Sequence, residues 1–120
     1  MIDFHAHMGN MAREGYPASP PLSAQQLVNW MDRNGIDRAV ILPLESPEGS
    51  WGYLLTEEAV AARDLFPQRL IAFCCVDPRY PNAAKFIRYH VERNGCKGLG
   101  EHVNGLAFDD PLNLIIYQTF

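Results

Sequence analysis

The chain has 120 residues, of which 48% are hydrophobic and 20% charged, as in an ordinary globular domain with a substantial core. The formal net charge of -4 argues against nucleic acid or an anionic membrane as a partner. No apolar run approaches the roughly 20 residues that a membrane span needs, and the N-terminus does not resemble a signal peptide. The three cysteines form no disulfide framework, so we expect them to be reduced, buried residues of a cytoplasmic protein.

The first predicted element is a strand at the N-terminus. Apolar and polar side chains alternate there, with Ile2, Phe4 and Ala6 on one parity and Asp3, His5 and His7 on the other. Side chains two residues apart in a strand leave the same face, roughly 6–7 Å apart, so two imidazoles can bind one divalent ion. The Asp3 carboxylate would share that face and accept the second ring N–H of a ligating histidine. The alternative is a half-buried strand whose histidines only satisfy local hydrogen bonds.

A loop rich in Gly and Pro is predicted over residues 8–22, where it would lie over the histidine pair. A helix follows, opened by the capping-box pair Ser23 and Gln26 and ended by Asn34-Gly35; its apolar stripe contains Leu27, Trp30 and Met31. Ile36 to Leu42 then reads as a buried strand that Pro43 ends.

The loop over residues 43–55 contains Trp51 and Tyr53, which either wall a substrate pocket or cover the rim of the sheet. Thr56 is predicted to cap a helix from Glu57 to Phe66. A third buried strand runs from Arg69 to Val76. Asp77 follows it and either binds substrate or serves only as a turn residue.

The remaining elements repeat the same order. Asn82 is predicted to cap a helix that carries His90 on its buried stripe, where a core or helix-end role is expected. A fourth strand covers residues 96–100, and Asp110 with Pro111 begins a fourth helix from Leu112 onward. Four strands that alternate with helices predict an α/β fold with a parallel sheet.

The run Asp3-Phe4-His5-Ala6-His7 resembles the strand-one signature of the amidohydrolase superfamily, metal-dependent hydrolases on a (β/α)8 barrel. With Gly9 after the histidines, it is similar to the amidohydrolase-related branch, which includes aminocarboxymuconate-semialdehyde decarboxylase. Complete barrels take about 250 residues, and this chain supplies four βα units of the eight. We therefore predict that residues 1–120 form a single domain, the N-terminal half of a TIM-type barrel. A flavodoxin-like open sheet, or a fragment that dimerises through its open edges, is the alternative.

The run Lys97-Gly98-Leu99-Gly100-Glu101-His102 resembles the Gly-Glu step of TatD-like deoxyribonucleases, whose Glu bridges two metals. This resemblance implies that Glu101 joins His5 and His7 as a ligand. A solvated loop carboxylate is the alternative, because the decarboxylase-like branch needs no ligand here. Glu101 and the following histidine cannot both face the metal without a bulge. A carboxylated Lys97 as bridging ligand is disfavoured by its place well before the strand end.

By resemblance, the chain belongs to a hydrolase in which a metal-activated water attacks a small amide, ester or lactone. Non-oxidative decarboxylation at the same metal is the nearest alternative, and a non-catalytic half-barrel with a structural or adventitious metal is the contrasting one. Zinc suits imidazole best, and manganese becomes favoured if carboxylates contribute more. The general base would come from a later strand, beyond Phe120. The expected partners are a small-molecule substrate and either a second copy of the chain or the missing C-terminal half of the barrel.

Overall fold

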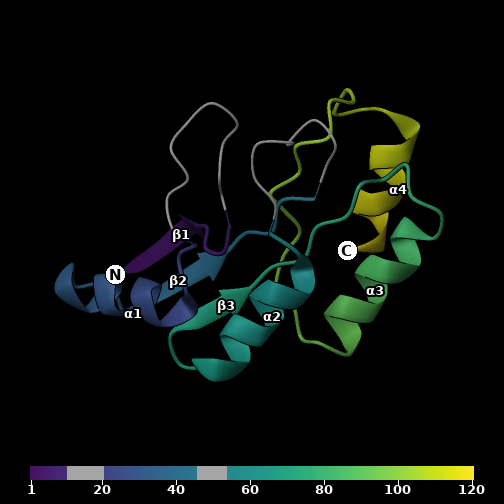
Figure 1. Ribbon diagram of the computed structural model, residues 1–120. Helices are drawn as coiled ribbons and strands as arrows, with labels where there is room; N and C mark the ends of the chain where they lie inside the picture. The colour runs from purple at the N-terminus through teal and green to yellow at the C-terminus, as the bar shows by residue number, and fades with distance from the viewer. Residues whose placement is uncertain (11–20, 46–53) are drawn as a thin grey trace.

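The computed structural model describes residues 1–10, 21–45 and 54–120 (Figure 1). Three parallel strands form one sheet in the order β1-β2-β3, and helices follow the strands along the chain. The elements are β1 (Ile2–Ala6), α1 (Ala24–Arg33), β2 (Arg38–Ile41), α2 (Thr56–Leu65), β3 (Leu70–Ala72), α3 (Ala83–Glu92) and α4 (Pro111–Thr119). Of the helices in the described part of the chain, none is long and apolar enough to cross a membrane.

The register between β1 and β2 changes within β1. Ile2 and Asp3 pair with Arg38 and Ala39, but Ala6 pairs with Ile41, so the ladder is irregular between Asp3 and Ala6. Such an irregularity shifts the side-chain parity of the residues that follow it. The strict period-two alternation predicted for the opening strand therefore does not hold along its whole length.

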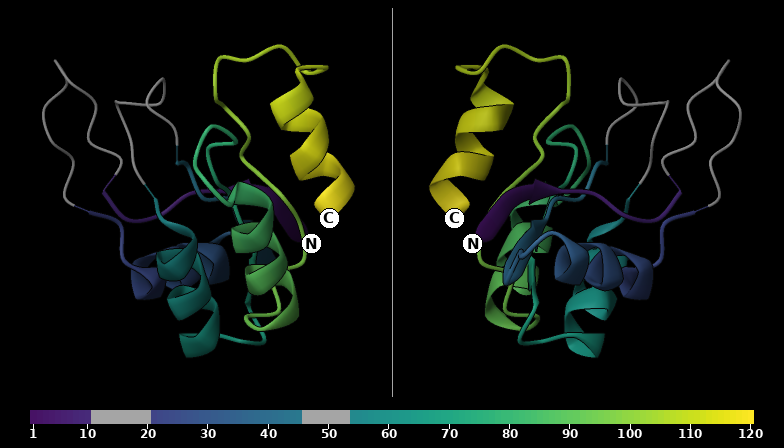
Figure 2. Two further views of the ribbon diagram at one scale, coloured as in Figure 1. Left: turned by 90° about the vertical axis from the view of Figure 1, so that its right-hand side faces the viewer. Right: turned by 90° about the vertical axis from the view of Figure 1, so that its left-hand side faces the viewer.

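Helices α1, α2 and α3 lie along one face of the sheet, and α4 packs beside α3 (Figures 1 and 2). The core lies between these helices and the sheet; its fully buried members include Met31, Ile41, Leu54, Leu70 and Ile87. On the other face, Ile2 and Phe4 are 56% and 68% exposed. The predicted stripe of α1 needs one correction: Leu27 and Met31 are buried, but Trp30 is 44% exposed.

The predicted fourth strand is not a regular strand. Residues 96–100 run beside the segment just after β3, joined to it by one parallel bridge, Cys74 with Leu99, and by hydrogen bonds such as Gly100 N–H to the Cys74 carbonyl at 2.9 Å. Gly100 has a φ of 136°, outside the range of an extended strand. The fourth βα unit thus has its helix, α4, but only a short bridged segment in place of its strand.

The helix starts are partly as predicted. The Ser23 hydroxyl accepts from Gln26 N–H at 3.2 Å, and the Gln26 side chain accepts from Ser23 N–H at 2.9 Å, so the capping box is confirmed. The Asp110 carboxylate likewise accepts from Leu112 N–H at 2.9 Å. The prediction that Thr56 caps α2 is wrong, because Thr56 is the first residue of the helix and Leu55 occupies the cap position. Asn82 occupies the cap position of α3 but bonds no backbone N–H through its side chain.

The predicted second and third strands are shorter than expected. β2 begins at Arg38 because Ile36 N–H still donates to the Met31 carbonyl at the end of α1, at 3.0 Å. β3 ends at Ala72, although Phe73 N–H continues the ladder to the Ile41 carbonyl at 3.1 Å. All three cysteines are buried free thiols, as predicted.

Candidate metal centre

His5, His7 and Glu101 meet at the C-terminal end of β1. The two Nε2 atoms of the histidines lie 3.1 Å apart. The Glu101 Oε2 atom lies 3.4 Å from Nε2 of His5 and 3.1 Å from Nε2 of His7. The structure therefore brings together all three side chains that the sequence predicts as ligands, two from the start of the chain and the third from a segment far along it.

A backbone hydrogen bond fixes the tautomer of His7. Its Nδ1 lies 2.9 Å from the carbonyl oxygen of Leu42, which can only accept a hydrogen bond. Nδ1 therefore carries a proton, and in the neutral ring Nε2 presents its lone pair to His5 and Glu101. A lone pair that faces a carboxylate oxygen at 3.1 Å is unfavourable unless a proton or a cation lies between them.

The separations fit three ligands of one divalent ion. Ligand atoms about 2.0–2.1 Å from a tetrahedral ion lie about 3.3–3.4 Å from one another. The three measured separations are 3.1, 3.1 and 3.4 Å. A single proton satisfies only one of the three close pairs, whereas a cation satisfies all of them. The side chains of His5, His7 and Glu101 are 58%, 23% and 32% exposed, so the site is open to solvent on the His5 side.

The backbone of Glu101 is held by the ends of two neighbouring strands. Its N–H donates to the Pro43 carbonyl at 2.8 Å, just after β2. Its carbonyl accepts from the Cys75 thiol, at 3.1 Å, beyond the end of β3. Burial raises the pKa of the Cys75 thiol to about 12, so the sulfur keeps the proton that it donates. Glu101 therefore approaches the histidine pair from a fixed backbone position.

Asp3 does not take the position predicted for it. Its carboxylate accepts from the backbone N–H of His5 at 3.0 Å, and the structure shows no contact with a histidine ring nitrogen in the described residues. Asp3 instead borders the space between β1 and α1. The Leu42 carbonyl orients His7 instead.

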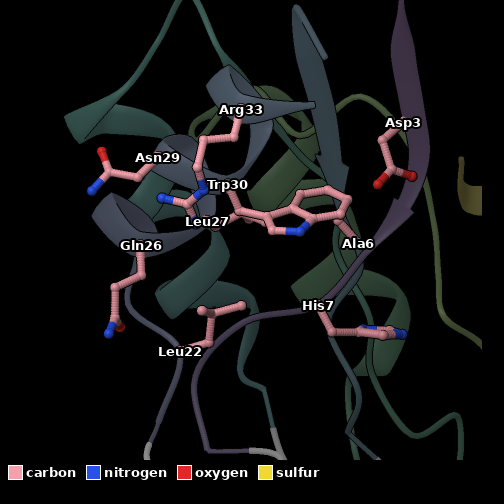
Figure 3. Close-up of a pocket in the computed structure, with 9 residues that line it drawn as sticks. All are labelled: Asp3, Ala6, His7, Leu22, Gln26, Leu27, Asn29, Trp30 and Arg33. Atoms are coloured by element: carbon pink, nitrogen blue, oxygen red, sulfur yellow. The ribbon is translucent and has the colours of Figure 1, made fainter. Parts of the chain in front are cut away.

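A cleft of about 530 Å³ lies between β1 and α1 (Figure 3). Asp3, Ala6 and His7 line its β1 side. Trp30 and Arg33 line its α1 side, with Trp30 extending across the cleft toward β1. His7 thus borders both this cleft and the three-residue cluster.

The other predicted site residues lie elsewhere. Asp77 is 1% exposed, and its two carboxylate oxygens bond the Arg79 guanidinium at 2.8 and 2.6 Å, which favours a turn role over substrate binding. Trp51 and Tyr53 lie outside the described residues. Lys97 is exposed and lines a different cleft, with Phe4 and Arg38. His90 is buried on α3, where a core role was predicted.

Sequence reasoning missed the groups that hold the ligands in place. The carbonyls of Leu42 and Pro43 are backbone atoms, and their roles depend on strand pairing that no local pattern displays. From its sequence context, Cys75 is predicted only to be a small buried residue, with no contact to a ligand. The thiol's place next to Glu101 comes from the packing of residue 101 against the end of β3.

Comparison with protein-family models and with curated proteins gave no match. Solved structures do match. A crystal structure named amidohydrolase II has a TM-score of 0.73 and 20% identity, covering 98% of this chain and 46% of its own. A probable 2-pyrone-4,6-dicarboxylic acid hydrolase from Acinetobacter baumannii has a TM-score of 0.63 and 18% identity, with 44% of its own chain covered.

A 5-carboxyvanillate decarboxylase from Novosphingobium aromaticivorans, with bound manganese, has a TM-score of 0.70 and 19% identity, with 47% of its chain covered. The chain thus spans less than half the length of the structures it matches. One of these neighbours is named an amidohydrolase, one a probable hydrolase and one a decarboxylase, which agrees with the resemblance of the opening residues. The predicted α/β fold, part of a TIM-type barrel, is confirmed.

Proposed function

We propose that this chain carries part of the active site of a metal-dependent hydrolase of amidohydrolase type, which acts on a small amide, ester or lactone. The observation that supports it is the convergence of two imidazole nitrogens and a carboxylate oxygen within 3.4 Å of one another. The hydrogen bond from His7 Nδ1 to Leu42 adds to this, because it directs a lone pair into the cluster.

In this proposal His5, His7 and Glu101 hold a divalent ion, and Leu42 keeps the His7 ring in its ligating orientation. A divalent ion supplies a Lewis acid and lowers the pKa of water toward 7. The exposed side of His5 leaves room for water and substrate to enter. By resemblance, we expect the general base on a later strand of the barrel than those described here, so we do not expect hydrolysis by these residues alone.

The ligand set is compatible with either zinc or manganese. Two imidazoles favour zinc, while a carboxylate in the set makes manganese more competitive. The decarboxylase neighbours hold manganese. We propose zinc as the first candidate and manganese as the second.

Decarboxylation is the second candidate function, because a neighbour with a TM-score of 0.70 is a 5-carboxyvanillate decarboxylase. Both reactions would use the same ligands, since each needs a metal that polarises an oxygen of the substrate. A non-catalytic domain that merely binds metal is the third reading, and it shares the ligand prediction without any turnover.

Metal content tests the proposal directly. Protein purified without a histidine tag and equilibrated with zinc or manganese should hold about one ion per chain, given three protein ligands. His5→Ala/His7→Ala should lose most of that metal. His90→Gln is the matched control, because His90 lies on α3, outside the cluster, and should keep its metal. Equal metal content in the double variant and the wild type would remove the ligand assignment.

A further inference from the structure

Asn113 is a buried amide in a helix of largely apolar sequence. It lies on α4 and is 1% exposed. Its Oδ1 accepts from Asn104 Nδ2 at 2.8 Å and lies 2.8 Å from Nε2 of His102, while its own Nδ2 donates to the Ala107 carbonyl at 2.8 Å. Both ends of the amide are thus satisfied, as a buried polar group requires.

The three side chains His102, Asn104 and Asn113 form one network, called here the His102 network. Asn104 is 4% exposed, and its Oδ1 accepts from Leu106 N–H at 3.0 Å. Nε2 of His102 lies 2.8 Å from Asn113 Oδ1 and 2.9 Å from Asn104 Nδ2, so it contacts both amides of the network. The Tyr117 ring of α4 packs edge-on against the His102 ring, with centroids 5.5 Å apart. His102 is therefore held to α4 by a hydrogen bond and by a ring contact.

The network begins at the residue that follows Glu101. Neighbouring side chains of an extended segment point to opposite sides. Here the Glu101 carboxylate faces His5 and His7, and the His102 ring faces α4. Figure 2 shows the segment after residue 100 leaving the sheet and leading directly to α4. The contacts of His102 with α4 thus fix the direction in which this segment presents its neighbour.

We propose that the His102 network positions Glu101: Asn113, acting through His102, keeps the Glu101 carboxylate turned toward the histidine pair. Asn113 and His102 are then positioning residues of the metal site, and neither touches the metal. This inference rests on the proposed metal function. In this proposal α4 contributes no ligand but helps to position one. Residues that orient a ligand without touching the metal typically change metal affinity 10- to 100-fold.

The ligand-binding test uses the whole 120-residue chain and Co²⁺, whose affinity and visible spectrum both respond to a lost ligand. Asn113→Leu removes the amide that contacts His102 and should weaken Co²⁺ binding about tenfold. His102→Gln keeps a hydrogen-bonding group at the position of Nε2 and should stay within about threefold of wild type. If Asn113→Leu does not fold, Asn113→Ala, which adds no branched side chain to the buried site, gives the same readout.

Two further variants separate positioning from stability. Ile87→Ala removes a fully buried side chain from α3 and lowers the stability of the fold without touching the network. It should leave Co²⁺ affinity within about threefold of wild type. Glu101→Gln should weaken Co²⁺ binding by itself, and adding Asn113→Leu to it should cause no further loss, because Asn113 acts through Glu101. The Co²⁺ spectra of Glu101→Gln and Asn113→Leu should change in the same direction.

The outcomes distinguish failure of the Glu101 ligand assignment from failure of the positioning role. If wild type does not bind Co²⁺, or Glu101→Gln binds it equally well, the Glu101 ligand assignment fails and the positioning role fails with it. If Glu101→Gln binds more weakly but Asn113→Leu does not, only the positioning role fails. If the losses of Co²⁺ affinity in the two single variants multiply in the double variant, or if Ile87→Ala loses as much affinity as Asn113→Leu, the effect comes from general stability. Either result would overturn the positioning role.

Discussion

His90 is a buried titratable group outside the metal cluster. It is 2% exposed on α3, with its Nδ1 atom 3.0 Å from Asn94 Nδ2 and its Nε2 atom 3.5 Å from a Glu57 carboxylate oxygen. The Asn94 amide donates to Nδ1, so the neutral ring carries its proton on Nε2, toward Glu57. Burial lowers the pKa of His90, and the opposing attraction of Glu57 is the smaller effect.

The lowered pKa predicts an acid-dependent loss of stability. Between the folded pKa and the ordinary value of 6.5, the unfolded chain binds more protons than the folded one. The stabilisation is therefore complete above pH 6.5 and is lost as the pH falls through that window. Each unit of pKa lowering corresponds to about 1.4 kcal/mol. Urea unfolding between pH 7.5 and about 5 should show a smaller loss for His90→Gln than for wild type; parallel curves would contradict the assignment.

The histidine pair shows which part of a site local sequence can predict. Asp-x-His-x-His in an alternating segment was enough to place His5 and His7 together, because both lie within a few residues of one strand end. Asp3 was misplaced by the same rule, since the register shift comes from pairing with β2 and leaves no local mark. Glu101 needed the family resemblance, because the contact joins residues far apart in sequence.

Helix α2 begins differently from the prediction, and its first residue has a structural role of another kind. Thr56 is fully buried. Its hydroxyl donates to the Cys75 carbonyl and accepts from the Cys75 N–H, both at 3.0 Å. The side-chain hydrogen bond at the start of α2 comes from the Glu58 carboxylate, which accepts from Leu55 N–H at 2.8 Å. Thr56 therefore joins α2 to the segment after β3.

Thr56→Val should be more destabilising than the loss of a helix cap. The valine leaves the Cys75 N–H and carbonyl unpaired in the core, and each unsatisfied buried group costs about 1–3 kcal/mol. Thr56→Ser keeps both hydrogen bonds and loses only a methyl, worth about 1 kcal/mol. Ser23→Ala, which removes a confirmed cap, should also cost about 1 kcal/mol. The free energy of unfolding in urea compares the three; equal losses for valine and serine would remove the bridging role.

Element order was predictable, and element bounds were less so. The caps Ser23 and Asp110 are local signals, because side chain and backbone partner lie within three residues. Strand length depends on the neighbouring strand. The segment over 96–100 has a strand-like sequence, but among the described residues it is joined to the segment just after β3 by one bridge, Cys74 with Leu99.

At the scale of the whole molecule, an aromatic contact links two segments of the sheet on the face opposite the helices. The rings of Phe4 and Phe73 meet edge to face with centroids 5.8 Å apart, joining β1 to the end of β3. Gly98 lies against Phe73, and a Cβ at that position would be 2.2 Å from the ring. A side chain on residue 98 is therefore incompatible with the present position of Phe73.

Gly98→Ala should destabilise the protein by about 1–3 kcal/mol, because the Phe73 ring must move and lose its contact with Phe4. In a Phe73→Leu background the penalty should fall, since the smaller side chain leaves room for the new methyl. A double-mutant cycle of unfolding free energies measures this coupling. Additive losses would show that the Phe73 ring is not what excludes a side chain at residue 98.

Strand β1 is one of the two outer strands of the sheet, and it exposes Ile2 and Phe4 on the same face. An exposed apolar edge strand promotes association with other chains. We expect the 120-residue chain to associate as its concentration rises in sedimentation velocity, and Phe4→Lys to reduce that association by placing a charge on the edge. Leu65→Lys is the matched control, because Leu65 is 71% exposed on α2, away from β1. Equal effects of the two lysines would exclude β1 as the contact, and a monomer at every concentration would refute the association itself.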